Sequence, residues 1–181
     1  MALRKGSAYS KRYARPYTRV SKKRAKTYIK TVPNAKIVKY KMGDQRAFDA
    51  GEFPVVLHMI SKEKCQIRDN SIEAIRQYLN RFLQVKVGKE FYLEGKIVPH
   101  HILRENKMLT GAGADRMQTG MSRAFGKTMG RAALVKPNQV LYIVGVKTLK
   151  AEAQARKLIQ SIKARIACKT SITNVMPPIK A

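Results

Sequence analysis

Acidic residues are missing from the first 43 positions of the chain, which hold 14 Lys and Arg. Residues 106–181 hold only two acids against 14 basic residues, whereas residues 44–105 are nearly balanced, with nine acids and ten basic residues. The formal net charge of the chain is +27. Because this much positive charge would repel itself in a free globule, we expect the usual partner to be a polyanion, either nucleic acid or an anionic membrane.

Long apolar runs are missing too. No stretch approaches the roughly 18 residues that a membrane-spanning helix needs. The charged start of the chain is not followed by the apolar segment of a secretory signal. Hydrophobic residues still make up 44% of the 181 residues, which is enough for a folded core. We therefore expect a cytoplasmic protein that binds nucleic acid and does not bind a membrane.

Cysteine and histidine are scarce. Cys65 and Cys168 are far apart in the sequence and form no CxxC motif, so we expect two reduced, buried thiols. His100 and His101 are adjacent and would point to opposite faces of a strand, which argues against a shared metal ion. His58 lies in an apolar run and is expected to be a hydrogen-bonded core residue. With no paired carboxylates or Ser/His/Asp pattern, we predict no catalytic residue, no metal and no cofactor.

Turn residues and apolar periodicity divide most of the chain into strands and two helices. The predicted strands are residues 37–40, 55–60, 65–68, 91–93, 97–98, 102–103, 131–135, 140–146 and 170–175. Residues 91–98 are expected to form a hairpin that turns at residues 94–96.

The first predicted helix begins at the N-cap Asn70, and its buried face contains Ile72, Ile75, Leu79 and Phe82. The second predicted helix covers residues 150–167, with Ala155, Leu158, Ile159, Ile162 and Ile166 on one face. This order of elements predicts an α+β fold, in which two helices pack on a mixed, mostly antiparallel sheet.

Residues 1–33 are expected to form a basic, extended N-terminal arm. Its Tyr residues alternate with Arg and Lys, and its few aliphatic residues cannot build a core, so we expect the partner to order it. Arg and Lys neutralise phosphates, and Tyr can stack on an unpaired base. The residues predicted to bind RNA are Arg4, Lys5, Tyr9, Lys11, Arg12, Tyr13, Arg15, Tyr17, Arg19, Lys22, Lys23 and Arg24.

A single RNA-binding domain is expected over residues 34–176, followed by a tail at 177–181. Within it, residues 105–130 break all periodicity and are rich in glycine, and a long insert of this kind is usually functional. Gly126-Lys127-Thr128 resembles the end of a phosphate loop, but the preceding glycine would have to replace Met121. A phosphate-loop NTPase is therefore a disfavoured alternative.

The string AGADRMQTGM at residues 112–121 resembles ribosomal protein L10e of archaea and eukaryotes, the counterpart of bacterial L16. Further segments that carry the resemblance are residues 33–37, 52–54, 107–109, 124–127 and 136–142. The resemblance extends over almost the whole chain. Three features together resemble the archaeal form: the long loop, the end at Ala181 without a longer tail, and the absence of N-terminal cysteines.

The resemblance implies a structural protein of the large ribosomal subunit with an α/β-hammerhead fold and no enzymatic activity. Its expected partners are large-subunit rRNA, tRNA in the assembled ribosome and neighbouring ribosomal proteins, and no homo-oligomer is expected. The loop at residues 108–127 would reach toward the peptidyl transferase centre. The loop residues expected at this functional centre are Gly111, Gly113, Asp115, Arg116, Gln118, Thr119, Arg123 and Lys127. A free-standing RNA-binding factor remains an alternative.

Overall fold

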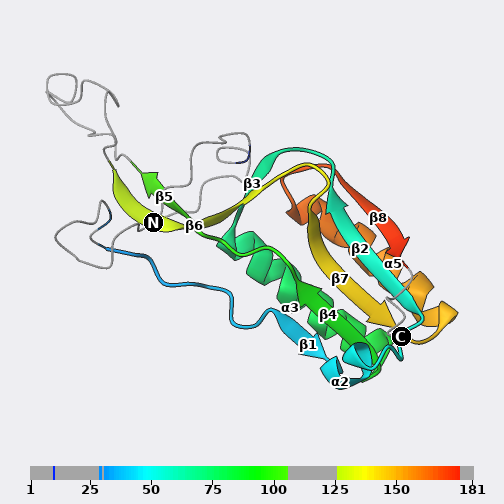
Figure 1. Cartoon of the computed structure of the whole chain (residues 1–181). Coiled ribbons are helices and arrows are strands. Elements are labelled where there is room, and N and C mark those ends of the chain that lie inside the picture. The colour runs from blue at the N-terminus through cyan, green and yellow to red at the C-terminus, as the bar shows by residue number, and fades with distance from the viewer. Residues whose placement is uncertain (1–9, 11–28, 30, 106–125, 176–181) are drawn as a thin grey trace, which may run out of the picture.

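Two antiparallel sheets organise the chain, and each contains strands that are far apart in the sequence. The computed structural model describes Ser10, Ile29 and residues 31–105 and 126–175. The larger sheet has five strands in the order β1-β4-β7-β2-β8, and the smaller has three in the order β3-β6-β5 (Figure 1). The strands of the larger sheet are, in that order, Lys41–Gly43, Phe91–Gly95, Val140–Val146, Val55–Ser61 and Thr170–Val175. Those of the smaller sheet are Cys65–Arg68, Lys127–Val135 and His101–Glu105.

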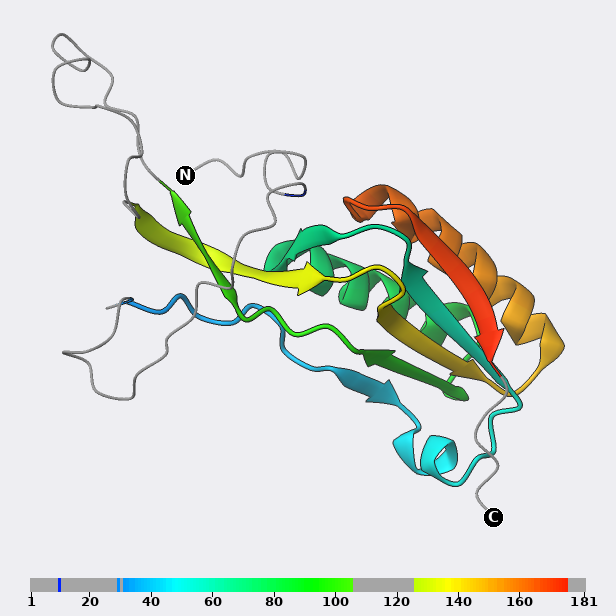
Figure 2. The same cartoon turned by 45° about the horizontal axis from the view of Figure 1, so that its top comes forward.

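Helices α3 (Asp69–Lys86) and α5 (Leu149–Ser161) cover one face of the larger sheet (Figures 1 and 2). A 3-10 helix, η2 (Ile162–Arg165), continues α5. The side chains buried on α5 and just after it are the five that the periodicity predicts: Ala155, Leu158, Ile159, Ile162 and Ile166. No helix within the described ranges is both long and apolar enough to cross a bilayer.

The main core fills the space between these helices and the sheet. Tyr142 of β7 is fully buried there, and its hydroxyl donates a hydrogen bond to the carbonyl of Ile72 in α3 at 2.9 Å. A second, smaller cluster lies on the opposite face of the sheet, because alternate residues of a strand point to opposite sides. In this cluster Phe48 of α2 (Gln45–Asp49) stacks on Tyr92 with ring centroids 3.9 Å apart.

The strand predictions for residues 55–60, 65–68, 140–146 and 170–175 are confirmed, and the α+β class is confirmed with them. The strand predicted at residues 37–40 is wrong: the first strand, β1, is at Lys41–Gly43, where Gly43 has φ of +85°. A Cβ at this position would lie 2.0 Å from the carbonyl oxygen of Phe91, so only glycine allows β1 and β4 to approach this closely. The sheet is not mixed, since every observed pairing is antiparallel.

The predicted hairpin through residues 94–96 is also wrong. β4 pairs with β1 and β7, whereas the next strand, β5, pairs with β6 in the smaller sheet. The chain leaves the larger sheet after Gly95, where the amide of Lys96 donates to the carbonyl of Leu141. Ile97 and Pro99 are buried along the connection, so burial explains the apolar residues that suggested a strand.

Three details of the helices differ from the prediction. The N-cap of α3 is Arg68, which makes no side-chain capping bond, and Asn70 is already inside the helix. Leu83 is in the core, while Phe82 is only half-buried. Helix α2 was not predicted, because its five residues contain too few apolar positions to show a period. Asp44 caps it by accepting a hydrogen bond from the amide of Ala47 at 3.0 Å.

Candidate nucleic-acid interface

Strands β5 and β6 form a twisted ribbon that extends from the helix-covered part of the molecule (Figure 2). β5 ends at Glu105 and β6 begins at Lys127, and these two residues are partners in the ladder. The predicted functional loop therefore joins the two strands at the outer end of this ribbon. Residues 127–130, which the sequence placed in the loop, belong to β6.

Gly126 closes the described end of the ribbon. Its φ is +139°, a conformation that residues with a side chain rarely adopt. A Cβ there would lie 3.1 Å from Cβ of Arg104 and 3.3 Å from the backbone of Glu105. The absence of a side chain therefore allows the chain to enter β6 directly beside the end of β5.

The C-terminal end of the predicted arm lies against β6. Thr128 donates from Oγ1 to the carbonyl of Thr31 at 2.9 Å, and Arg131 donates from Nε to the carbonyl of Pro33 at 2.8 Å. Ile29 is 1% exposed, so the chain is packed as well as hydrogen-bonded at this point. We name Thr31, Pro33, Thr128 and Arg131 the arm anchor. It attaches the end of the predicted arm to the strand that follows the predicted loop.

Carboxylates of the helix-covered part are largely used in local ion pairs. The pairs are Glu52 with Lys147 (3.0 Å), Glu63 with Lys169 (3.6 Å), Glu73 with Arg76 (2.6 Å), Glu94 with Lys96 (2.8 Å) and Glu152 with Arg156 (2.7 Å). The hydrogen bonds from Arg76 lower the pKa of Glu73 below its ordinary value. Each of these five acids thus neutralises a neighbouring cation.

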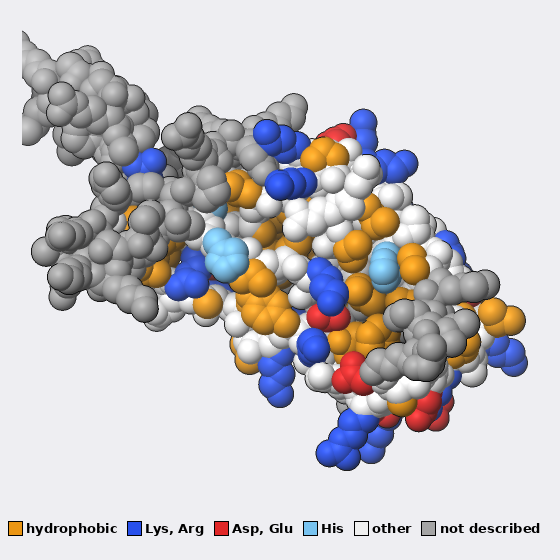
Figure 3. Space-filling model, viewed as in Figure 1, with side chains coloured by type: hydrophobic (Ala, Val, Ile, Leu, Met, Phe, Trp, Pro, Cys, Tyr) orange, Lys and Arg blue, Asp and Glu red, His pale blue; other side chains and the backbone are white. Residues whose placement is uncertain are grey.

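The positive charge comes from Lys and Arg and not from histidine. His101 of β5 is buried, and burial together with Arg104 lowers its pKa below the ordinary 6.5. His58 is half-buried on the open face of the larger sheet and is not the core residue that its apolar run suggested. Its pKa is lowered by partial burial and by Lys96. Figure 3 shows hydrophobic and histidine side chains over this face, with Lys and Arg both among them and at its margins.

Of the predicted RNA-contacting residues, only Lys127 lies within the described ranges. It is exposed and is the first residue of β6. The predicted arm residues, Arg4 to Arg24, lie outside the described residues, and so do the predicted loop residues from Gly111 to Arg123. The roles of Thr128 and Arg131 could not be predicted, because their partners are carbonyl groups nearly a hundred residues away.

The phosphate-loop alternative conflicts with the fold. In a phosphate loop, the Lys and Thr of the motif lie in the first turn of a helix, whose amide groups face the phosphates. Here Lys127 and Thr128 open the nine-residue strand β6, and the Thr128 hydroxyl is bonded to Thr31. The residues that would hold a nucleotide are therefore in the wrong backbone conformation.

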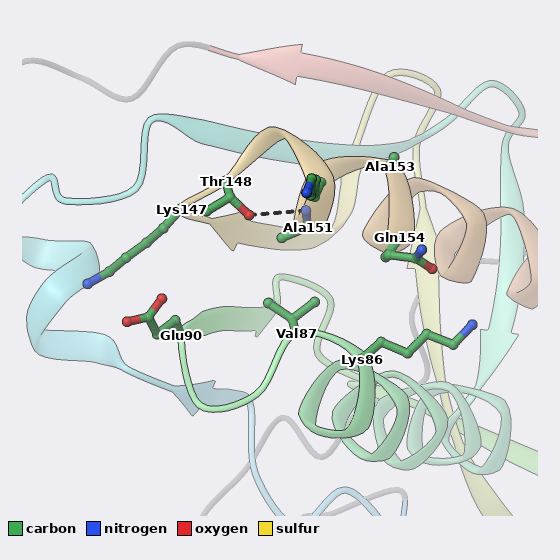
Figure 4. Close-up of a pocket in the computed structure, with 9 residues that line it drawn as sticks. Lys86, Val87, Glu90, Lys147, Thr148, Ala151, Ala153 and Gln154 are labelled. Atoms are coloured by element: carbon green, nitrogen blue, oxygen red, sulfur yellow. Dashed lines mark hydrogen bonds between the residues drawn. The ribbon is translucent and has the colours of Figure 1, made fainter.

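A hollow of about 440 Å³ lies between the end of α3 and the start of α5. Lys86 and Lys147 line it, but Figure 4 shows that their ammonium groups point in opposite directions. Thr148 at its edge is used as the N-cap of α5, where its hydroxyl accepts from the amide of Ala151 at 3.2 Å. The ammonium groups of Lys86 and Lys147 thus do not converge on one point in this hollow.

A large positive net charge that is unevenly distributed along the chain is typical of basic nucleic-acid-binding proteins. Residues 15–173 match the family described as Ribosomal protein L16p/L10e, and the chain belongs to this family. The resemblance seen in the loop sequence is thereby confirmed. The family consists of ribosomal proteins and not of enzymes.

Three archaeal relatives, each named large ribosomal subunit protein uL16, show how far the similarity extends. The chain is 40% identical to the protein of Methanococcus maripaludis over 182 aligned positions, which cover 99% of both chains. It is 43% identical to that of Archaeoglobus fulgidus over 145 positions, or 80% of this chain and 78% of the relative. It is 43% identical to that of Thermofilum pendens over 147 positions, or 81% of this chain and 82% of the relative.

Proposed function

We propose that this protein is the uL16-type structural component of the large subunit of the cytoplasmic ribosome, where it binds large-subunit rRNA. The observation that carries the proposal is the arm anchor, together with membership in the family. It attaches a basic segment to the ribbon that bears the loop, so that one rRNA region could be bound by both. Neighbouring ribosomal proteins are further partners, and the protein acts as a single copy.

The arm supplies most of the affinity in this proposal. Residues 1–33 form the arm, residues 34–176 the α+β domain of hammerhead type, and residues 177–181 a tail. Each Lys or Arg that neutralises a phosphate releases condensed counterions, so binding weakens as salt rises. The Tyr residues of the arm pack among sugars and unpaired bases.

The loop supplies the functional contacts. Residues 108–127 reach the region near the peptidyl transferase centre and help to organise bound tRNA, while peptide transfer itself belongs to the RNA. Arg116, Gln118, Arg123 and Lys127 face RNA in this arrangement. Support comes from Gly126 and the ladder pair of Glu105 with Lys127, which fix both ends of the loop at the ribbon tip.

The first experiment distinguishes an integral subunit protein from a free-standing RNA-binding factor. A tagged copy of the chain is expressed in an archaeal host, and its sedimentation is followed through a gradient in low and in high salt. We expect it to remain with the large subunit in both. Release from ribosomes by moderate salt would favour the free-standing factor.

The second experiment tests the arm directly. Arg12, Arg15 and Arg19 are replaced together by Gln, and binding to large-subunit rRNA is measured from low to high salt. The slope of log affinity against log salt should become shallower by roughly 2–3, since each lost phosphate contact removes about 0.7–0.9. The control changes Lys157, an exposed residue of α5, to Gln and should leave the slope unchanged. Equal slopes for both variants would contradict the role of the arm.

A further inference from the structure

The fold brings the two cysteines of the chain together. Cys65 is the first residue of β3, and Cys168 lies between η2 and β8. The pairing of β2 with β8 ends at Ser61 and Thr170, and the amide of Lys62 donates to the carbonyl of Lys169 at 2.9 Å. The turn after β2 then brings Cys65 into the same buried cluster as Cys168, with the two thiols close enough to interact.

A chain of hydrogen bonds distinguishes the two thiols. Ser61 Oγ lies 3.4 Å from Cys168 Sγ, and the Ser61 hydroxyl donates to the carbonyl of Glu63 at 2.7 Å. Cys168 therefore has hydrogen-bonding groups on two sides. Cys65 is 3% exposed and Cys168 is 9% exposed, so Cys168 is the more accessible sulfur.

These contacts give the two thiols opposite acidities. The neighbouring Cys65 thiol lowers the pKa of Cys168 to about 7, although burial acts in the opposite direction. The hydrogen bond to Cys168 and burial raise the pKa of Cys65 above its ordinary value. Cys168 is therefore the more acidic of the two thiols and also the more exposed, which fits an attacking sulfur beside a resolving one.

We propose that Cys65 and Cys168 form a reversible disulfide site that low-molecular-weight disulfides oxidise. The Cys168 thiolate attacks one sulfur of the small disulfide, forms a mixed disulfide and expels one small thiolate. That thiolate takes the proton of Cys65, and Cys65 then attacks the Cys168 sulfur and expels the second small thiolate. Two protein thiols are oxidised to one disulfide, and one small disulfide is reduced to two thiols.

The site is independent of the proposed ribosomal role. A bond between these sulfurs would join the start of β3, in the sheet that continues to the ribbon, to the segment before β8 at the edge of the larger sheet. Disulfides in reducing compartments are usually transient and sense redox conditions, and a reversible bond of this kind has that character. It would hold the two sheets together at their junction.

The first test uses the full-length reduced protein, oxidised glutathione as the probe, and intact mass after free thiols are blocked. The wild-type protein should lose two hydrogens and retain no glutathione. Cys65→Ser should stop at one glutathione on Cys168, and Cys168→Ser should react at least tenfold more slowly than Cys65→Ser. In the wild-type protein, the rate of the first attack should rise with pH to a midpoint below the pKa of about 9 that is ordinary for a thiol.

Two results would overturn the proposal. One is a wild-type protein that keeps glutathione, because the second sulfur would then be out of reach. The other is a native protein that does not react in the time that fully oxidises the denatured chain.

Thermal unfolding of the wild-type protein gives a test that needs no variant to fold. The bond would close a loop of about a hundred residues, so the oxidised protein should melt roughly 10–20 °C above the reduced protein. Cys65→Ser/Cys168→Ser should melt at one temperature with and without the oxidant. An oxidised wild-type protein that melts no higher than the reduced one would also contradict the proposal.

Discussion

Replacing Arg131 by Leu should loosen the arm anchor without unfolding the domain. The bond lost joins Nε of Arg131 to the carbonyl of Pro33 at 2.8 Å. A hydrogen bond from a charged donor contributes roughly 1.5–3 kcal/mol, and partial exposure of Arg131 places it near the lower limit. A loss of about 1.4 kcal/mol corresponds to a tenfold change in an equilibrium. The detached state of residues 31–33 should therefore be populated about tenfold more.

Hydrogen exchange measures this detachment directly. The amides of Thr31 and Val32 should exchange about tenfold faster in Arg131→Leu than in the wild-type protein. The matched control is Lys136→Leu, which removes the same charge from an exposed position just beyond β6. Lys136 is hydrogen-bonded through its backbone amide, which the substitution retains. If the amides of Thr31 and Val32 exchange at the same rate in both variants, the positive charge and not the hydrogen bond holds residues 31–33 against β6. That result would refute the argument for the arm anchor.

Other substitutions test the ribbon, the core and the histidines. Gly126→Val should lower the free energy of unfolding by roughly 1–3 kcal/mol in urea titrations, because its φ is +139° and its side chain would meet Arg104; an unchanged midpoint would exclude strain at the ribbon tip. Tyr142→Phe should cost about 1–2 kcal/mol in the same assay, because the buried carbonyl of Ile72 loses a donor. The pKa values of His58 and His101 are lowered in the folded protein. Below pH 6.5, the ordinary pKa of histidine, the unfolded chain therefore binds more protons than the folded chain. Stability should therefore fall as pH is lowered through about 6.5, and a melting temperature that is flat from pH 8 to 5.5 would contradict this.

Elements defined by local pattern could be predicted from the sequence. The run of apolar residues at 55–60 and the faces of the two long helices report burial directly, so β2, α3 and α5 were found. The choice of strand partners could not be predicted in this way. Residues 91–98 look like a local hairpin, but β4 pairs with β7, which is fifty residues away, because the buried connection through Ile97 leads β5 into another sheet.

The candidate interface shows the same division. Composition predicted the arm, and the irregular string at residues 112–121 identified the family. The arm anchor was invisible in the sequence, because Arg131 and Thr128 bind carbonyl groups that any residue could supply. The cysteine pair was missed for a related reason: Cys65 and Cys168 meet only after β2 has paired with β8.

Crosslinking within purified large subunits tests the central claim most directly. Subunits that contain the tagged chain are irradiated, and crosslinked peptides are identified by mass spectrometry. The account predicts crosslinks to large-subunit rRNA from residues 4–24 and 108–127, with few from the exposed face of α5. Crosslinks from α5 alone, or a chain that is absent from the purified large subunit, would contradict it.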